Sequence, residues 1–201
     1  LAQQVARELE WLYAKSGARM ATCVGGMDMR EERRTLARGA HIVVGTPGRL
    51  SDHIRRGSLD ASNVRVVVLD EADEMLDMGF REELEHILEG TPETRRTLMF
   101  SATVPKGIAA LAARYQKDAM RITTAAEQQQ HVDIEYRALL VAPGDEENAI
   151  VNIVRHSDSE TAIVFCTTRA AVNKLISRMG NRGFPVVALS GELSQKERGN
   201  A

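Results

Sequence analysis

Short apolar segments alternate with longer amphipathic ones along most of this chain, and this alternation limits the possible folds most strongly. The segment Val66-Val67-Val68-Leu69 is purely apolar, which is typical of a parallel strand buried on both faces. Parallel neighbours must be joined by crossover connections, and the segments 47–56 and 80–89 show the apolar spacing of helices. The alternation therefore predicts an α/β protein built on parallel sheets.

The same pattern gives a complete set of expected elements. The expected strands are 19–24, 41–44, 64–69, 95–100 and 119–122, and the expected helices are 1–15, 28–38, 47–56, 80–89 and 105–115. The polar stretch 124–132 has no period and is typical of a linker. After it the alternation restarts, with strands expected at 133–141, 161–166 and 184–189 and helices at 145–155 and 168–180. We therefore expect one α/β domain at 1–123 and a second at 133–201.

Composition excludes several classes of protein. With 43% hydrophobic residues and a net charge of −2, the chain is too apolar and too weakly charged to be mainly disordered. No apolar run approaches the roughly 20 residues of a membrane span, and the first residues are too polar for a signal peptide. We therefore expect no membrane partner. Cys23 and Cys166 lie in strand-like segments, which favours buried thiols in a reducing cytoplasm.

The small net charge hides a pattern along the chain. Residues 1–66 contain 11 Lys and Arg against 7 Asp and Glu, and residues 161–201 contain 6 against 2. Residues 67–160 contain 9 basic residues against 19 acidic ones. A chain that is basic at both ends and acidic in the middle could form an anion-binding face from two separated segments.

Acidic residues follow directly on the apolar strand 64–69, in the order Asp70-Glu71-Ala72-Asp73. Ligands of open α/β sheets bind at the carboxyl ends of strands, where an acid can hold Mg²⁺ on a nucleotide. A second acid beside it can orient or deprotonate an attacking water. Acids are also favoured in the first turn of a helix, so this motif alone leaves both readings open.

Further motifs follow the other predicted strands. Ser101-Ala102-Thr103 would place two hydroxyls beside the acidic loop if strands 64–69 and 95–100 are neighbours, although Ser there is also a common helix cap. Thr46-Pro47-Gly48-Arg49 combines a cap, a helix-starting Pro, a small residue and a cation, which suits phosphate binding. Gly25-Gly26 would let the backbone approach a phosphate closely, or would simply form a turn.

Taken in this order, these motifs resemble the DEAD-box ATP-dependent RNA helicases. Asp70-Glu71-Ala72-Asp73 matches the motif that names the family, and the resemblance continues in the second half of the chain. The further matching segments are Leu1-Ala2-Gln3-Gln4, Ile163-Val164-Phe165-Cys166-Thr167-Thr168-Arg169, Gly191 and Gln195-Lys196-Glu197-Arg198. The resemblance covers essentially the whole chain and implies two RecA-like parallel-sheet domains, the ATP-binding domain at 1–123 and the C-terminal helicase domain at 133–201.

The resemblance also implies roles for these residues. Asp70 would hold Mg²⁺ through water, Glu71 would activate the water that attacks the γ-phosphate of ATP, and Asp73 would bond to Ser101 and Thr103. The implied RNA-binding residues are Gly25, Gly26, Thr46, Gly48 and Arg49 in the first domain and Phe165, Thr167, Arg169, Gly191, Gln195 and Arg198 in the second. Because contacts to the RNA backbone carry no base information, RNA would be bound without strong sequence preference.

The chain also departs from the family pattern. It contains no G-x-x-x-x-G-K-[ST] phosphate loop, no adenine-reading glutamine motif and no C-terminal arginine motifs. We therefore expect a first domain truncated at its N-terminus, a second truncated at its C-terminus, and a chain without ATPase activity of its own. In the family's sheet, the missing strand would leave a gap beside 95–100 and leave 119–122 poorly paired.

Two alternatives to a catalytic helicase segment remain open from the sequence. The first is a non-catalytic RNA-binding or regulatory remnant, in which the backbone-gripping motifs act without ATP. The second is a different P-loop ATPase, such as a transporter motor, which would share only the strand-end acids. The motifs at 46–49, 101–103 and 195–198 disfavour the second, and no feature of the sequence indicates a protein partner.

Overall fold

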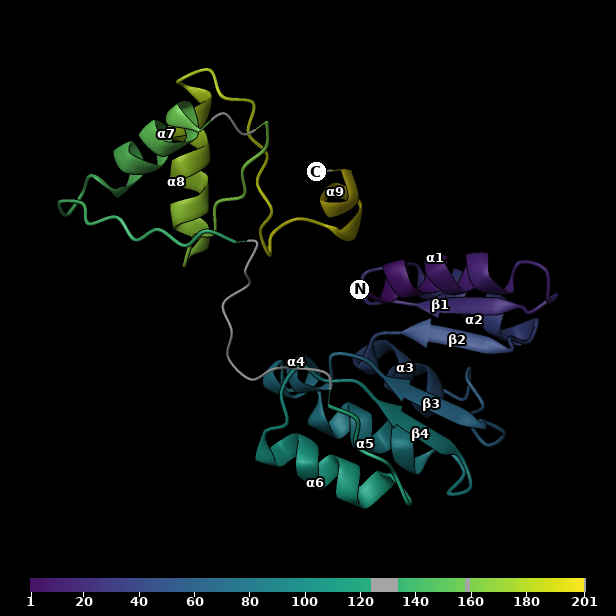
Figure 1. The fold of residues 1–201 in the computed structure, drawn as a ribbon. Helices are drawn as coiled ribbons and strands as arrows, with labels where there is room; N and C mark the ends of the chain where they lie inside the picture. Colours follow the sequence, from purple (N-terminus) through teal and green to yellow (C-terminus); the bar gives the residue numbers. More distant parts are fainter. Residues whose placement is uncertain (124–133, 158–159, 201) are drawn as a thin grey trace. The chain divides into compact units, whose positions relative to one another are not determined.

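The chain forms two compact units, Leu1–Ile122 and Thr123–Ala201, in the computed structural model (Figure 1). The structure describes residues 1–123, 134–157 and 160–200. The expected linker at 124–132 lies outside these described residues. Each unit is described by itself below.

The first unit alternates helices and strands, as the sequence predicts. Its elements are α1 (Ala2–Tyr13), β1 (Met20–Cys23), α2 (Met29–Ala37), β2 (Ile42–Gly45), α3 (Pro47–Arg55), β3 (Val66–Leu69), α4 (Ala72–Asp77), α5 (Arg81–Glu89), β4 (Arg96–Met99) and α6 (Lys106–Tyr115). The expected elements from 1–15 to 105–115 all form, within a few residues of their expected ends. The short helix α4, which begins inside the acidic motif at Ala72, was not among the expected elements.

Both strand pairs of the first unit are parallel. In one pair β1 lies beside β2, with Cys23 opposite Gly45, and in the other β3 lies beside β4, with Leu69 opposite Met99. Figure 1 shows the four arrows following one another from β1 to β4. Because paired strands run in the same direction, the loops that follow them leave from the same edge. The parallel α/β class predicted from the alternation is thereby confirmed.

Apolar side chains fill the space between the strands and the helices. One core contains Leu69 of β3 with Leu84 and Leu88 of α5 and Ile108 and Leu111 of α6. A second core forms around Ala21, Cys23 and Leu36, against which Val43 and Leu50 pack. Helices α3 and α5 are also joined by a hydrogen bond of 3.0 Å between Ser51 Oγ and His86 Nδ1.

The segment 119–122 does not form the strand that its sequence suggests. Met120 and Ile122 are largely exposed, and among the described residues β4 pairs with β3 alone. The expected gap beside β4 is therefore present, and the expected poor pairing of 119–122 takes the form of no pairing. The physical reason is that strand residues need a neighbouring ladder to satisfy their backbone groups, and no neighbour is offered here.

In the second unit the helices form and the expected strands do not. Its helices are α7 (Glu146–His156), α8 (Arg169–Gly180) and α9 (Gln195–Asn200). In the part of this unit that the structure describes, 134–141, 161–166 and 184–189 join no sheet, so these strand predictions are wrong. Many of their apolar side chains are left in solvent, Phe165 with 92% of its surface exposed, because no partner strand covers them, whereas Cys166, Phe184 and Val186 pack against the helices of this unit.

A small core and a cluster of ion pairs hold α7 against α8. Val151 of α7 packs on Leu175 and Met179 of α8. Lys174 Nζ lies 2.7 Å from Glu147 Oε1, and Arg178 pairs with the other oxygen of the same carboxylate. The second unit is thus held by helix packing.

Two further expectations concern the cysteines and the membrane. Both cysteines are free; Cys23 is buried, whereas Cys166 is only half-buried because its segment joins no sheet. Among the described helices, none has the length and the apolar character needed to cross a membrane.

The first core predicts a clear difference between two leucine substitutions. Leu84 is 1% exposed and Leu12 is 62% exposed. We expect Leu84→Ala to lower the free energy of unfolding by about 2–4 kcal/mol, because a cavity remains in a packed core. The control, Leu12→Ala, should change it by no more than about 0.5 kcal/mol. Urea denaturation followed by circular dichroism measures both, and equal effects would contradict this description of the core.

Candidate functional site

The acidic motif lies at the carboxyl end of β3, where the chain turns sharply. Asp70 is half-buried and Glu71 is exposed, and the backbone N–H of Glu71 donates to Asp70 Oδ1 at 3.1 Å. Glu71 has φ 51° and ψ 48°, a left-handed conformation that is uncommon outside glycine. The strained turn lets α4 start immediately at Ala72, whose N–H donates to the carbonyl of Phe100 at 3.1 Å. Two carboxylates are thus presented at the sheet edge.

Asp73 joins this motif to the loop that follows β4. Its Oδ2 accepts hydrogen bonds from the backbone N–H and from the hydroxyl of Thr103, each at 2.8 Å. Ser101 Oγ accepts from the backbone N–H of Asp73 at 3.3 Å and donates to the carbonyl of Thr103 at 2.6 Å. The hydroxyls that the sequence placed beside the acidic loop are therefore in contact with it. The loops after β3 and β4 form one hydrogen-bonded network.

This network changes the acidity of Asp73. The hydrogen bond from the Thr103 hydroxyl lowers the pKa of Asp73 to about 2, and the backbone N–H of Thr103 and the Ser101 hydroxyl act in the same direction. Burial of the side chain, which is 6% exposed, opposes this shift. Asp73 is therefore ionised throughout the neutral range and holds the loop after β4 as a charged acceptor.

The glycine pair and the Thr-Pro-Gly-Arg motif meet at the edge of the other strand pair. The hydroxyl of Thr46 accepts from the N–H of Gly25 at 3.3 Å, and the N–H of Thr46 donates to the carbonyl of Cys23 at 3.0 Å. Gly25 and Gly26 are exposed, and Gly26 has φ +81°, which a residue with a side chain rarely adopts. Gly48 lies in the first turn of α3. The structure thus brings both motifs into one surface.

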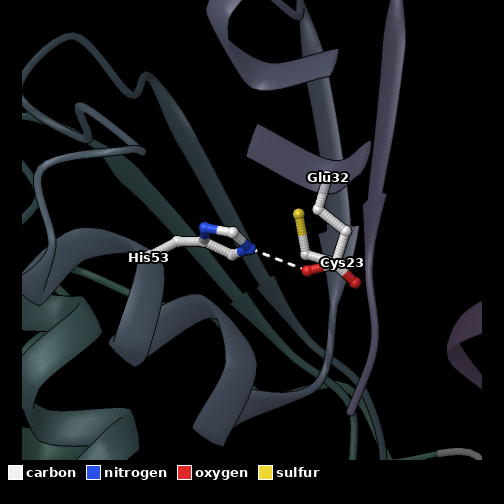
Figure 2. A group of neighbouring side chains, drawn as sticks. All are labelled: Cys23, Glu32 and His53. Atoms are coloured by element: carbon white, nitrogen blue, oxygen red, sulfur yellow. Dashed lines mark hydrogen bonds and ion pairs between the residues drawn. The ribbon is translucent and has the colours of Figure 1, made fainter. Parts of the chain in front are cut away.

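Arg49 points inward. Its Nη2 donates to the carbonyl of Met27 at 3.2 Å, its Nη1 lies 3.5 Å from Glu32 Oε2, and its side chain is 13% exposed. Glu32 is itself buried and accepts from His53 Nε2 at 2.7 Å. Figure 2 shows His53 and Glu32 directed at one another with Cys23 beside them.

Glu32 and His53 were not among the expected site residues. The segment 28–38 was expected only as a helix, and charged residues dominate it. One signal was available: Glu32 lies four residues before the apolar Leu36, which places both on one face of a helix, and Leu36 is also buried. His53 likewise lies three residues after Leu50, which packs on the second core.

The site residues expected in the second unit lie on exposed segments. The side chains of Phe165, Thr167 and Arg169 are exposed, and Arg169 Nη1 lies 3.2 Å from Glu192 Oε1. Because Glu192 directly follows Gly191, this ion pair brings two of the expected motifs together. Arg198 is exposed on α9, which Ser194 and Glu197 cap through mutual hydrogen bonds. Gln195 starts this helix, and its side chain lies outside the described structure.

The donor chemistry at the β3 edge fits a hard divalent cation. Asp70 offers carboxylate oxygens, which are the ligands that Mg²⁺ takes, and Mg²⁺ needs only one or two of them because it keeps several waters. No G-x-x-x-x-G-K-[ST] segment occurs in the 201 residues, so the sequence holds no lysine-bearing phosphate loop. Acids at the carboxyl end of a buried parallel strand are typical of α/β proteins that cleave nucleoside triphosphates.

Comparison with known proteins agrees with this class and narrows it. Residues 1–111 match the family model of DEAD/DEAH box helicases. The chain belongs to the DEAD/DEAH box helicase family.

Relatives and a solved structure resemble nearly the whole chain. The DEAD-box ATP-dependent RNA helicase CshA of Bacillus cereus is 38% identical over 98% of the chain, and the ATP-dependent RNA helicase DeaD of Haemophilus influenzae is 36% identical over 98%. A crystal structure of a DEAD box protein from Methanococcus jannaschii matches 99% of the chain with 37% identity and a TM-score of 0.59. The chain spans 38% of that CshA, 32% of that DeaD and 53% of the crystallised protein.

The lowered pKa of Asp73 predicts how acid weakens the fold. A carboxyl group whose pKa is lower in the folded chain than its ordinary value of 3.8 stabilises the fold above that value. This stabilisation is lost as the pH falls from about 4 to about 2. We expect Asp73→Asn to remove this stabilisation. Between pH 5 and pH 2 the free energy of unfolding of the variant should fall by about 1–2 kcal/mol less than that of the parent chain. The free energy of unfolding is measured by urea denaturation at each pH. Parallel curves of this free energy against pH for the two chains would contradict a lowered pKa at Asp73.

Proposed function

We propose that these 201 residues form part of an ATP-dependent RNA helicase that couples ATP hydrolysis to local separation of RNA strands. In this proposal residues 1–123 belong to the ATP-binding domain and 133–201 to the C-terminal helicase domain, with 124–132 as the linker. The observation that carries the proposal is the hydrogen-bonded network of Asp73 with Ser101 and Thr103. This network connects the acidic motif to the loop after β4. An enzyme that couples ATP hydrolysis to RNA strand separation requires a connection of this kind.

The acids divide the chemistry between them. Mg²⁺ bound to ATP neutralises the charge that develops on the phosphates. Asp70 would hold this ion through water, since its carboxylate lies at the end of β3 and fits the oxygen preference of the ion. Glu71 is exposed beside it and would orient the water that attacks the γ-phosphate and accept its proton. Asp73 would couple hydrolysis of the nucleotide to the loop after β4 through its hydrogen bonds with Thr103 and Ser101.

RNA would be bound along its sugar-phosphate backbone. In the first unit the surface formed by Gly25, Gly26, Thr46 and Gly48, with Arg49 beneath it, would contact RNA. In the second unit the contacts would come from exposed residues, namely Phe165, Thr167, Arg169, Gly191, Gln195 and Arg198. Both groups lie in the basic ends of the sequence, which suits a polyanion. Such contacts carry no base information, so we propose little sequence preference.

The 201-residue chain on its own is proposed to bind RNA without hydrolysing ATP efficiently. A phosphate loop positions the triphosphate and an arginine finger is worth about 10³–10⁵ in rate, and the sequence contains neither motif. This observation also favours the second candidate function, a non-catalytic RNA-binding or regulatory role. The family match removes the alternative of a transporter motor. Both remaining functions place the protein in the cytoplasm, in keeping with its free thiols.

Two measurements on the purified chain test this proposal. We expect binding to a fluorescent single-stranded RNA that weakens as salt rises, because bound phosphates release counterions. We also expect RNA-stimulated ATP hydrolysis near the background rate, with Glu71→Gln leaving RNA affinity unchanged. Absence of RNA binding would contradict the proposed function. A strong ATPase rate that Glu71→Gln abolishes would show that the chain is catalytically competent alone.

A further inference from the structure

A buried carboxylate ties the exposed glycine loop after β1 to helix α3, at the end of the β1–β2 pair. Glu32 of α2 uses one oxygen, Oε1, to accept the backbone N–H of Val24 at 3.0 Å. Its other oxygen, Oε2, accepts from His53 Nε2 at 2.7 Å and lies 3.5 Å from Arg49 Nη1. Arg49 in turn donates to the carbonyl of Met27 at 3.2 Å. The glycine loop is therefore held on both sides, at Val24 and at Met27.

We propose that Arg49 acts at the RNA interface as a positioning residue anchored by Glu32, and that phosphates are contacted by the Gly25-Gly26 backbone and Thr46. This inference rests on the proposed function and assigns roles within that surface. A guanidinium that is 13% exposed, paired with a carboxylate and hydrogen-bonded to a carbonyl, has little free charge or surface to offer a phosphate.

A hydrogen bond of 3.2 Å from the N–H of Met27 to the carbonyl of Val24 closes the glycine loop as a turn, and the anchor adds side-chain bonds on either side of it. Gly25 and Gly26 have no side chains, and Gly26 is in a left-handed conformation. Glycine has more backbone freedom than any other residue when its conformation is not fixed. Without the anchor, the glycine loop would therefore sample more backbone conformations. Fixing the backbone on either side of the glycines keeps the exposed amide groups in one arrangement for a ligand to meet.

The same cluster could be considered as a metal site. One potential ligand atom each from Cys23, Glu32 and His53 lies within 4.8 Å of the other two, and all three residues are buried (Figure 2). The guanidinium of Arg49 beside the same carboxylate disfavours a second cation there. Burial also raises the pKa of Cys23 to about 11, so its thiol keeps its proton. The arrangement therefore favours a hydrogen-bonded anchor, and zinc binding becomes an outcome of the test.

The salt dependence of RNA binding separates positioning from direct contact. Each phosphate contact to single-stranded RNA contributes about 0.7 to the slope of log affinity against log salt. We expect Arg49→Gln to weaken binding about tenfold, as loss of one charge-assisted hydrogen bond would, with an unchanged slope. Arg169→Gln, at an exposed proposed contact, should reduce the magnitude of the slope by about 0.7. The same reduction in Arg49→Gln would overturn the inference.

Substitution of Glu32 gives a second test. A role through charge alone and a role as an anchor predict opposite changes in RNA affinity. Removing an acid near bound phosphate should strengthen binding if Glu32 acts only through its charge. We expect Glu32→Ala to weaken binding about tenfold and the isosteric Glu32→Gln to restore part of it. Glu31→Ala, on the exposed face of α2, is the matched control and should not weaken binding. Tighter binding by Glu32→Ala would overturn the inference.

A measurement without RNA keeps this inference distinguishable from the proposed function. We expect the amide NMR signals of Gly25 and Gly26 to shift in Arg49→Gln and to stay in place in Glu31→Ala. If these signals shift but no chain binds RNA, the anchor is present and the proposed function fails. Unchanged signals in Arg49→Gln would overturn the anchor itself. A melting temperature that falls with EDTA and recovers with zinc would assign the cluster to a metal instead.

Discussion

The parallel pairing of β3 with β4 is the interaction on which the candidate site depends. It places the end of one strand beside the end of the other, with Leu69 opposite Met99. The residues that follow are then close enough for Asp73 to accept two hydrogen bonds from Thr103. A shift of register by one residue would turn every side chain to the other face and separate these groups. The pairing of the strands thus sets where the acidic motif lies relative to the loop after β4.

The parallel pairing of β1 with β2 likewise brings together the residues that follow the two strands. Its register brings Gly25 and Thr46 together at the edge. Behind them lies Glu32, a buried charge with hydrogen-bonding partners on both oxygens, as buried charges require. The end of the β3–β4 pair therefore presents carboxylates, and the end of the β1–β2 pair presents exposed glycine backbone.

The sequence predicted most of the first unit because its signals there are local. Periodicity located the strands and helices, and the resemblance to the DEAD-box helicases implied the bond of Asp73 to Ser101 and Thr103. The left-handed turn at Glu71 and helix α4 were missed, because a non-glycine residue gives no local sign of that conformation. Glu32 and His53 were missed because burial of a charge depends on partners distant in sequence.

The second unit shows the limit of periodicity. The segments 161–166 and 184–189 have the composition of strands, yet a strand exists only beside another strand. Phe165 remains exposed for this reason, whereas α7 and α8 bury Val151 and Leu175 between them, with Phe184 and Val186 packed against this core. Helices close their own hydrogen bonds within one segment, and so they form where the predicted strands do not.

The central claim, that Asp73 and Thr103 act as one unit, is tested most directly by a double-mutant cycle. The free energy of unfolding is measured for the parent chain, Asp73→Ala, Thr103→Ala and the double variant. Residues joined by hydrogen bonds show coupling energies of about 0.5–3 kcal/mol. We predict coupling in this range, with the double variant little less stable than Asp73→Ala alone. Strictly additive effects would contradict this claim, because they would mean that Asp73 and Thr103 do not act on one another.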